Sequence, residues 1–67
     1  MFIIIELQTS HGTTTNLVYV FSDRNSAEHQ YHTILSSAAV STVDVHTAIL
    51  TNEYGAFLKK ESYNHNA

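Results

Sequence analysis

The chain has 67 residues, which is enough for one small domain. It contains no cysteine, so disulfide bonds and thiolate metal sites are excluded, and association with another chain is the remaining way to bury more surface. The chain has six acidic and three basic residues, and charged residues are only 13% of it. The cluster of Lys and Arg that binding to nucleic-acid phosphates requires is therefore missing.

The first predicted elements are strands over residues 2–9 and 16–22, both rich in β-branched and aromatic residues. The opening apolar run stops at Glu6, so we expect a strand here rather than a signal peptide or a membrane span. A two-residue loop, His11-Gly12, makes the two strands a hairpin. Its predicted register pairs Ile5 with Val18 and Ile3 with Val20.

The stretch from Asp23 to Ser41 predicts the only long helix, with Asp23 as its N-cap and Asn25 with Glu28 as a second capping box. Its apolar residues recur at helical spacing and predict a stripe that packs on the sheet. The stripe consists of Ala27, Tyr31, Ile34, Leu35 and Ala38. The opposite side of the helix is almost free of charge, which is unusual for a solvated surface.

A second hairpin is predicted from strands over 43–51 and 56–63, with a loop at Asn52–Gly55. A four-residue loop pairs Ile49 with Leu58, facing the helix, and Leu50 with Phe57. A short helix over 57–63 is the alternative for the last strand. The sum is an α+β protein of ββαββ order, a four-stranded antiparallel sheet with one helix on one face. Residues 1–63 form the single domain, and 64–67 a flexible C-terminal tail.

Both strands of the first hairpin are apolar on both faces, whereas an open sheet with one solvated face alternates apolar and polar residues. We therefore expect a second copy to cover the face that the helix leaves open. The alternative is a monomer in which the segment after Phe57 folds over that face. The predicted interface consists of Phe2, Ile4, Leu17, Tyr19 and Phe21 on the sheet, and His29, His32, Ser36 and Val40 on the outer side of the helix.

Histidine is the residue type that most invites a search for chemistry. His29 and His32 are three residues apart on the helix and are candidate metal ligands, but two ligands do not make a site, and two exposed polar histidines are the simpler interpretation. His46 is expected to pair with Glu61 across the second hairpin, as a surface contact. We predict no resident metal or cofactor.

Catalytic signatures are missing from the sequence. There is no G-x-S-x-G motif, and the two glycines lie in turns rather than in a phosphate-binding loop. Small tautomerases use an N-terminal proline as the base, and this chain has no proline. The aromatic residues lack the interleaved Lys and Arg of a platform for nucleic-acid bases. We therefore predict a protein that is not an enzyme.

The order of motifs resembles small uncharacterised proteins encoded by phages and prophages of Gram-positive bacteria. The likeness covers most of the chain and rests on turns, a cap and a core stripe, which are structural features. They are Gln8-Thr9 with Gly12-Thr13, the A-x-x-x-Y-H pattern of Ala27, Tyr31 and His32, and Asn52–Gly55. The resemblance implies a phage accessory protein that acts by binding, in the cytoplasm of the bacterial host.

The function we predict is that of a small non-enzymatic binding module. It would form a homodimer or higher oligomer and dock on a protein partner, with antagonism of a bacterial defence system as the candidate role. One alternative is an oligomer that binds or sequesters a small ligand such as a nucleotide. The other is a metal-dependent enzyme that uses His29 and His32. Neither nucleic acid nor a membrane is an expected partner.

Overall fold

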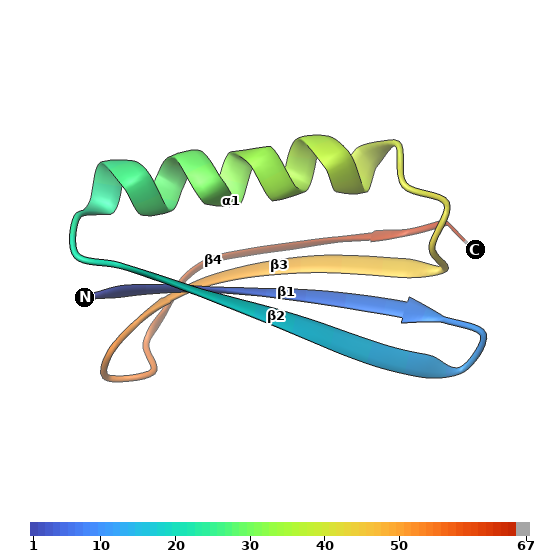
Figure 1. Cartoon of the computed structure of the whole chain (residues 1–67), viewed down its shortest axis with the longest axis horizontal. Helices are drawn as coiled ribbons and strands as arrows, with labels where there is room; N and C mark the ends of the chain where they lie inside the picture. Colours follow the sequence, from blue (N-terminus) through green and yellow to red (C-terminus); the bar gives the residue numbers. More distant parts are fainter. Residues whose placement is uncertain (66–67) are drawn as a thin grey trace.

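The computed structural model describes residues 1–65 and has four strands and one helix in the order ββαββ. The elements are β1 (Phe2–Ser10), β2 (Thr13–Phe21), α1 (Arg24–Ala39), β3 (Val45–Asn52) and β4 (Phe57–Asn64). The strands form one antiparallel sheet in the order β2-β1-β3-β4, and α1 lies along one face of it (Figure 1). The predicted α+β class and element order are confirmed.

The first hairpin has the predicted two-residue turn and register. His11 and Gly12 both have positive φ angles, 53° and 80°, as a type I′ turn requires. That turn matches the right-handed twist of the strands, so the ladder runs without a break from Ile5↔Val18 in its middle to Ser10↔Thr13 at the turn. β2 therefore begins at Thr13, three residues before the predicted start.

Helix α1 begins after Asp23, whose carboxylate accepts a 2.8 Å hydrogen bond from the Ser26 amide. This confirms the predicted N-cap. Glu28 takes no part in a second capping box, because its carboxylate accepts hydrogen bonds from Arg24 and Lys59. The buried residues of α1 are four of the five in the predicted stripe: Ala27, Tyr31, Ile34 and Ala38. The fifth, Leu35, packs partly buried against the same cluster.

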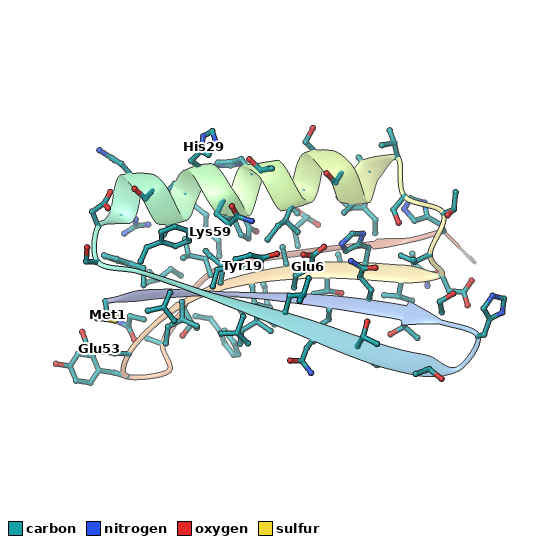
Figure 2. All side chains as sticks on the ribbon, in the orientation of Figure 1. Met1, Glu6, Tyr19, His29, Glu53 and Lys59 are labelled. Atoms are coloured by element: carbon teal, nitrogen blue, oxygen red, sulfur yellow. The ribbon has the colours of Figure 1, made fainter. Side chains whose placement is uncertain are left out.

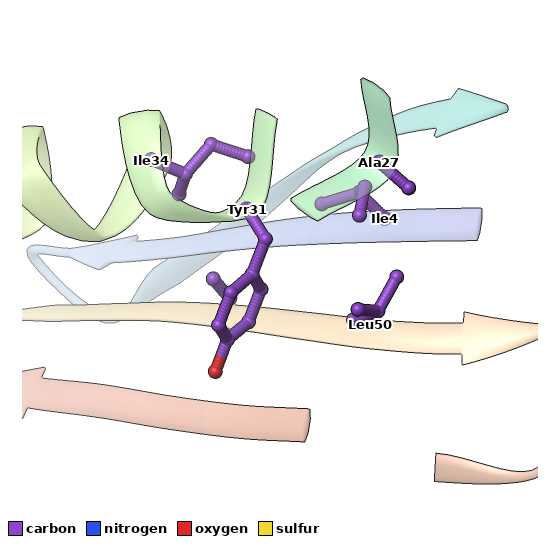
Figure 3. Packing of buried hydrophobic residues seen from close by; sticks show 6 residues of the cluster. Ile4, Ala27, Tyr31, Ile34 and Leu50 are labelled. Atoms are coloured by element: carbon purple, nitrogen blue, oxygen red, sulfur yellow. The ribbon is translucent and has the colours of Figure 1, made fainter. Parts of the chain in front are cut away.

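The core lies between α1 and the two central strands. Ile4 of β1 and Leu50 of β3 are completely buried beneath Ala27 and Tyr31 (Figure 3). We predicted that the helix would cover the other face, the one with Ile49, and that prediction is wrong. The first hairpin is apolar on both faces and gives no preference, whereas β3 does: Ala48, on the side of Leu50, has a small, completely buried side chain that lets α1 approach closely.

The second hairpin departs from the predicted register because β4 contains an irregularity at Leu58. Leu50 pairs with Lys59 and Thr51 with Phe57, so Leu58 has no partner in the ladder. The predicted pairs Ile49–Leu58 and Leu50–Phe57 are therefore wrong. Residues 57–64 form a strand, which also excludes the alternative of a short helix there.

Asn64 and His65, the last described residues, are held in place rather than forming part of a flexible tail. Asn64 is the last residue of β4, and the His65 amide donates a 2.8 Å hydrogen bond to the Asp44 carbonyl. The His65 ring nitrogen Nε2 donates to the Ala38 carbonyl at 2.7 Å. The predicted tail of 64–67 is thus wrong for its first two residues, and the rest of it lies outside the described residues.

Candidate functional site

The face of the sheet opposite α1, which we call the open face, is covered by no element among residues 1–65. Side chains alternate along a strand, so the neighbours of the buried Ile4 and Leu50 point to this side. By the strand register, the open face consists of residues 3, 5, 7 and 9 of β1, 14, 16, 18 and 20 of β2, 45, 47, 49 and 51 of β3, and 57, 60, 62 and 64 of β4. Half of these side chains are apolar: Ile3, Ile5, Leu7, Val18, Val20, Val45, Ile49 and Phe57. Most of the polar ones lie towards the His11-Gly12 end of the sheet.

Charge is nearly absent from the open face. Among the described side chains that the register places there, Lys60 is the only charged one, and its ammonium lies 5.7 Å from the centre of the Phe57 ring. Val18, Val20 and Phe57 are each more than half exposed, at 57%, 56% and 64%. A single exposed valine is ordinary on a protein surface, whereas several apolar side chains side by side on one sheet face are typical of an interaction surface.

A shallow concavity lies where β3 and β4 run side by side. Its volume is about 340 Å³, and it is lined by Thr47, Ile49, Lys60, Glu61 and Ser62. By the register, Thr47, Ile49, Lys60 and Ser62 direct their side chains to the open face, whereas Glu61 directs its carboxylate to the side of α1. This is a polar margin of the open face rather than an enclosed ligand cavity.

On the other side of the sheet, Glu6 and His46 form a buried pair beneath the helix. The His46 nitrogen Nε2 lies 2.6 Å from Glu6 Oε2, and the two residues are only 4% and 8% exposed. Gln8 donates a second hydrogen bond to the same carboxylate oxygen, at 3.0 Å. The register explains the meeting, because Gln8 of β1 lies opposite His46 of β3 and Glu6 lies on the same face two residues away.

The second ring nitrogen of His46 decides what this pair can do. Nδ1 is buried and has no hydrogen-bond partner. When the imidazole is neutral, a proton on Nε2 bonds to the carboxylate and leaves Nδ1 as a bare acceptor, which costs less than an unsatisfied N–H donor. A Glu–His pair that activates a nucleophile needs a hydroxyl or thiol at that nitrogen. Within residues 1–65 no such group reaches it, so the arrangement is that of a structural hydrogen bond.

Sequence reasoning missed this pair. It placed His46 on a solvated surface opposite Glu61, whereas Glu61 lies opposite Ala48, and His46 lies opposite Tyr63. The available signal was the sequence of β1, where Glu6 interrupts the apolar series that Phe2 and Ile4 begin. Using it required the knowledge that β1 and β3 are neighbours in the sheet.

The predicted sheet interface must also be corrected. Ile4 is completely buried, and Phe2, Tyr19 and Phe21 pack partly buried against the core. The helix covers this face of the sheet, so these four residues do not form a free surface. Leu17 lies on the same side but remains 52% exposed, since β2 diverges from the helix towards the turn (Figure 1).

The predicted helix surface is where the sequence placed it. His29, His32, Ser36 and Val40 are all exposed, and Figure 2 shows His29 on the side of α1 away from the sheet. The only charged residues of α1, Arg24 and Glu28, lie in its first two turns. The middle and end of the helix therefore present a neutral surface.

No metal site forms around His29 and His32. His32 Nε2 lies 3.5 Å from Glu28 Oε1, a contact across one helical turn. Among residues 1–65, no group of three or more His, Cys, Asp or Glu side chains is arranged to hold a metal ion. Glu28 is instead occupied by two cations, Lys59 at 2.7 Å and Arg24 at 3.2 Å.

Among residues 1–65, three side chains have clearly shifted pKa values, and each shift has a structural cause. The hydrogen bond from Lys59 lowers the pKa of the Glu28 carboxyl. The Ser26 amide lowers the pKa of Asp23, because it donates to the ionised form. Burial raises the pKa of the Tyr31 phenol, with the negative charge of Glu61 adding to it. These shifts belong to a cap, a surface ion pair and a core residue.

In comparisons with known proteins, no family model, curated protein or solved structure matches the chain significantly. In the described part of the chain, no helix has both the length and the apolar character needed to cross a membrane. The functional argument therefore rests on the surfaces of the chain itself.

Proposed function

We propose that the protein is a small non-enzymatic binding module that assembles with a second copy of itself through the open face. The observation that carries this proposal is the composition of that face: one charged side chain, Lys60, among apolar and uncharged polar side chains, with no element of the described chain covering it. An isologous dimer suits such a surface, because a face with a single charge, at the strand on its edge, can stack on its copy with little like-charge repulsion.

The size of the open face supports a second copy as its occupant. Four strands about 4.8 Å apart, with eight or nine residues of about 3.3 Å each, give a face of roughly 28 × 19 Å, or about 530 Å². Stacking two such faces removes about 1,100 Å² from solvent before the relief of the side chains is counted. A specific interface should bury at least about 1,000 Å², so the open face is just large enough.

The neutral outer surface of α1 supports the second part of the proposal, docking on a protein partner. His29, His32, Ser36 and Val40 remain exposed when the open faces stack, because they lie on the opposite side of the molecule. Val40 is 82% exposed at the end of the helix. The phage origin, the cytoplasmic location and the antagonism of a bacterial defence system stay predictions.

A second candidate function is binding of a small ligand, and the concavity beside Lys60 favours it. The lysine and the hydroxyl groups of Thr47 and Ser62 suit an anionic ligand. A nucleotide whose binding uses this site should raise the melting temperature, and Lys60→Ala should abolish the rise. If no nucleotide raises it, the small-ligand function is eliminated.

The assembly is tested by native mass spectrometry at micromolar concentration. We expect a mass of at least two 7.5 kDa chains. Ile5→Lys places a charge at the centre of the open face and should halve the mass. Phe57→Lys should weaken the assembly at the margin of this face, where the side chain is mostly exposed. Thr42→Lys, in the exposed loop before β3, is the matched control and should leave the mass unchanged.

Far-UV circular dichroism of each variant separates loss of assembly from loss of folding. Ile5→Lys and Phe57→Lys should keep the spectrum of the parent protein, since a lysine on a solvated face keeps its charge in water. A parent protein that is a 7.5 kDa monomer, or an Ile5→Lys variant with the parent's mass, would contradict the proposal.

A further inference from the structure

β2 is an edge strand without any of the features that usually prevent edge-to-edge pairing. It lies at one end of the strand order, and its nine residues, TTTNLVYVF, contain no charge and no proline. Its ladder to β1 has no bulge from Phe2↔Phe21 to Ser10↔Thr13. Seven of the nine residues are exposed. An edge of this kind presents a regular row of N–H and C=O groups to another strand.

The other edge of the same sheet provides an internal comparison. β4 carries three consecutive charged residues, Lys59, Lys60 and Glu61, and an irregularity at Leu58 that shifts its register. Charged side chains and bulges are the devices by which proteins protect an exposed edge. One edge of this sheet is thus protected twice, while the other is not protected at all.

We propose that β2 pairs antiparallel with β2 of a second copy and makes one continuous eight-stranded sheet across two chains. Antiparallel pairing of identical strands follows a two-fold axis, so each residue makes the same contact in both copies. The absence of charged side chains from β2 favours a second copy as the pairing strand. In a two-fold pair, any charge near the centre of β2 would lie opposite the same charge of the other copy. The self-pairing of an uncharged strand carries no such cost.

The length of β2 fits this interface. In an antiparallel ladder every second residue directs both its N–H and its C=O towards one neighbour, so nine residues on each side give roughly eight or nine hydrogen bonds. Typical protein–protein interfaces contain about ten direct hydrogen bonds. The exposed Leu17, near the middle of β2, adds apolar contact beside the ladder.

Edge pairing through β2 and stacking of the open faces are geometrically compatible. The combined assembly described next rests on the proposed function. A two-fold axis through the paired β2 strands keeps both helices on one side of the eight-stranded sheet. The two open faces then form one continuous surface on the other side. Stacking two such sheets gives a closed tetramer with perpendicular two-fold axes and all four helices outside.

The test combines a variant of each interface. Leu17→Lys charges the centre of the β2 edge through an exposed side chain that the register places on the side of α1, so the open face is not altered. We expect the parent protein to have four times the chain mass of 7.5 kDa, and this β2 variant and Ile5→Lys each to halve it. The variant with both substitutions should be a monomer, and Thr42→Lys a tetramer.

The two proposals fail in different ways. A parent dimer that Ile5→Lys dissociates and the β2 variant does not would overturn the edge pairing and leave the open-face dimer standing. A parent dimer that only the β2 variant dissociates would overturn the open-face dimer instead. Hydrogen exchange gives an independent reading, since alternate amides of β2 should be protected in the parent and exchange fast in the β2 variant. Fast exchange of those amides in the parent would also overturn the edge pairing.

Discussion

Replacing Ile4 and its neighbour Ile5 by alanine, one at a time, tests which face of the sheet the helix covers. The two residues are adjacent in β1 and identical, so the chemical change is the same and only the side of the sheet differs. Ile4 is completely buried against Ala27, Tyr31 and Leu50, whereas Ile5 lies on the open face. The comparison is best made in the Phe57→Lys background, where we expect the open face to be solvated.

The expected loss for Ile4→Ala follows from its burial. The substitution removes three carbon atoms worth about 0.8 kcal/mol each in transfer free energy, and the cavity that remains raises the total to about 2–5 kcal/mol. A domain of this length has an unfolding free energy of roughly 3–10 kcal/mol, so Ile4→Ala should lose a large share of its stability. Ile5→Ala removes a side chain that is only partly buried, for which we expect about 1 kcal/mol.

Urea unfolding followed by circular dichroism measures both losses. The result that supports the structure is a larger loss for Ile4→Ala by at least about 1 kcal/mol, with an unchanged slope of free energy against urea. Equal losses, or a larger loss for Ile5→Ala, would mean that the helix covers the opposite face. Ile4→Val is the milder version, with an expected loss of about 0.5–1.5 kcal/mol, should the alanine variant fail to fold.

Other parts of the structure predict further outcomes. Removing one member of the buried pair, by Glu6→Leu or His46→Leu, should lower the free energy of unfolding in urea by about 3–5 kcal/mol, and the double variant should recover most of that loss. A double variant as unstable as either single one would show that Glu6 and His46 stabilise the protein by more than their mutual hydrogen bond. Asp23→Ala should lower the melting temperature at pH 7 and Asp23→Asn should not, because asparagine also caps helices. The folded-state pKa of Asp23 lies below its ordinary value of 3.8. Its ionised carboxylate therefore stabilises the fold fully above pH 3.8, and this stabilisation disappears as the pH falls through the lowered pKa. If Asp23→Ala remained less stable than the parent in stronger acid, the ionised cap would not be the cause of the difference. Gly12→Ala should lower the free energy of unfolding by about 1–2 kcal/mol, and only because of its φ of 80°, since no neighbouring atom lies within 4 Å of the added methyl group. His11→Asn should raise stability, because asparagine favours the type I′ turn. An unchanged urea midpoint for Gly12→Ala would contradict that turn.

Local signals in the sequence predicted most of the elements correctly. The Asp23 cap, the helical stripe and the His11-Gly12 turn each depend on residues close together in the chain, and the structure contains all three. The register of the first hairpin followed as well, because a two-residue turn fixes it.

The face of the sheet could not be predicted, because it depends on the packing of distant elements. β1 and β2 are apolar on both sides, so their alternation does not indicate which side meets the helix. The deciding residue is Ala48, whose small side chain permits close approach, and an alanine in a strand gives no such signal by itself. The irregularity at Leu58 likewise has no signature in the sequence, and it displaced the predicted pairs of the second hairpin.

The sheet residues predicted for the interface lie on the side that the helix covers, for the same reason. The reasoning that an apolar open face needs a cover does not depend on which face is open, so it transfers from Phe2, Tyr19 and Phe21 to Ile3, Ile5 and Val18. The Glu6–His46 pair was beyond sequence reasoning because it joins strands 40 residues apart. Its recognition requires the strand order, which no local pattern in the sequence specifies.

The mass of the native particle at micromolar concentration, for the parent protein and for Ile5→Lys, tests the central claim most directly. The account predicts a parent particle of at least two 7.5 kDa chains and a folded variant of half the parent's mass. A parent particle of one chain, with the open face in contact with solvent, would contradict it.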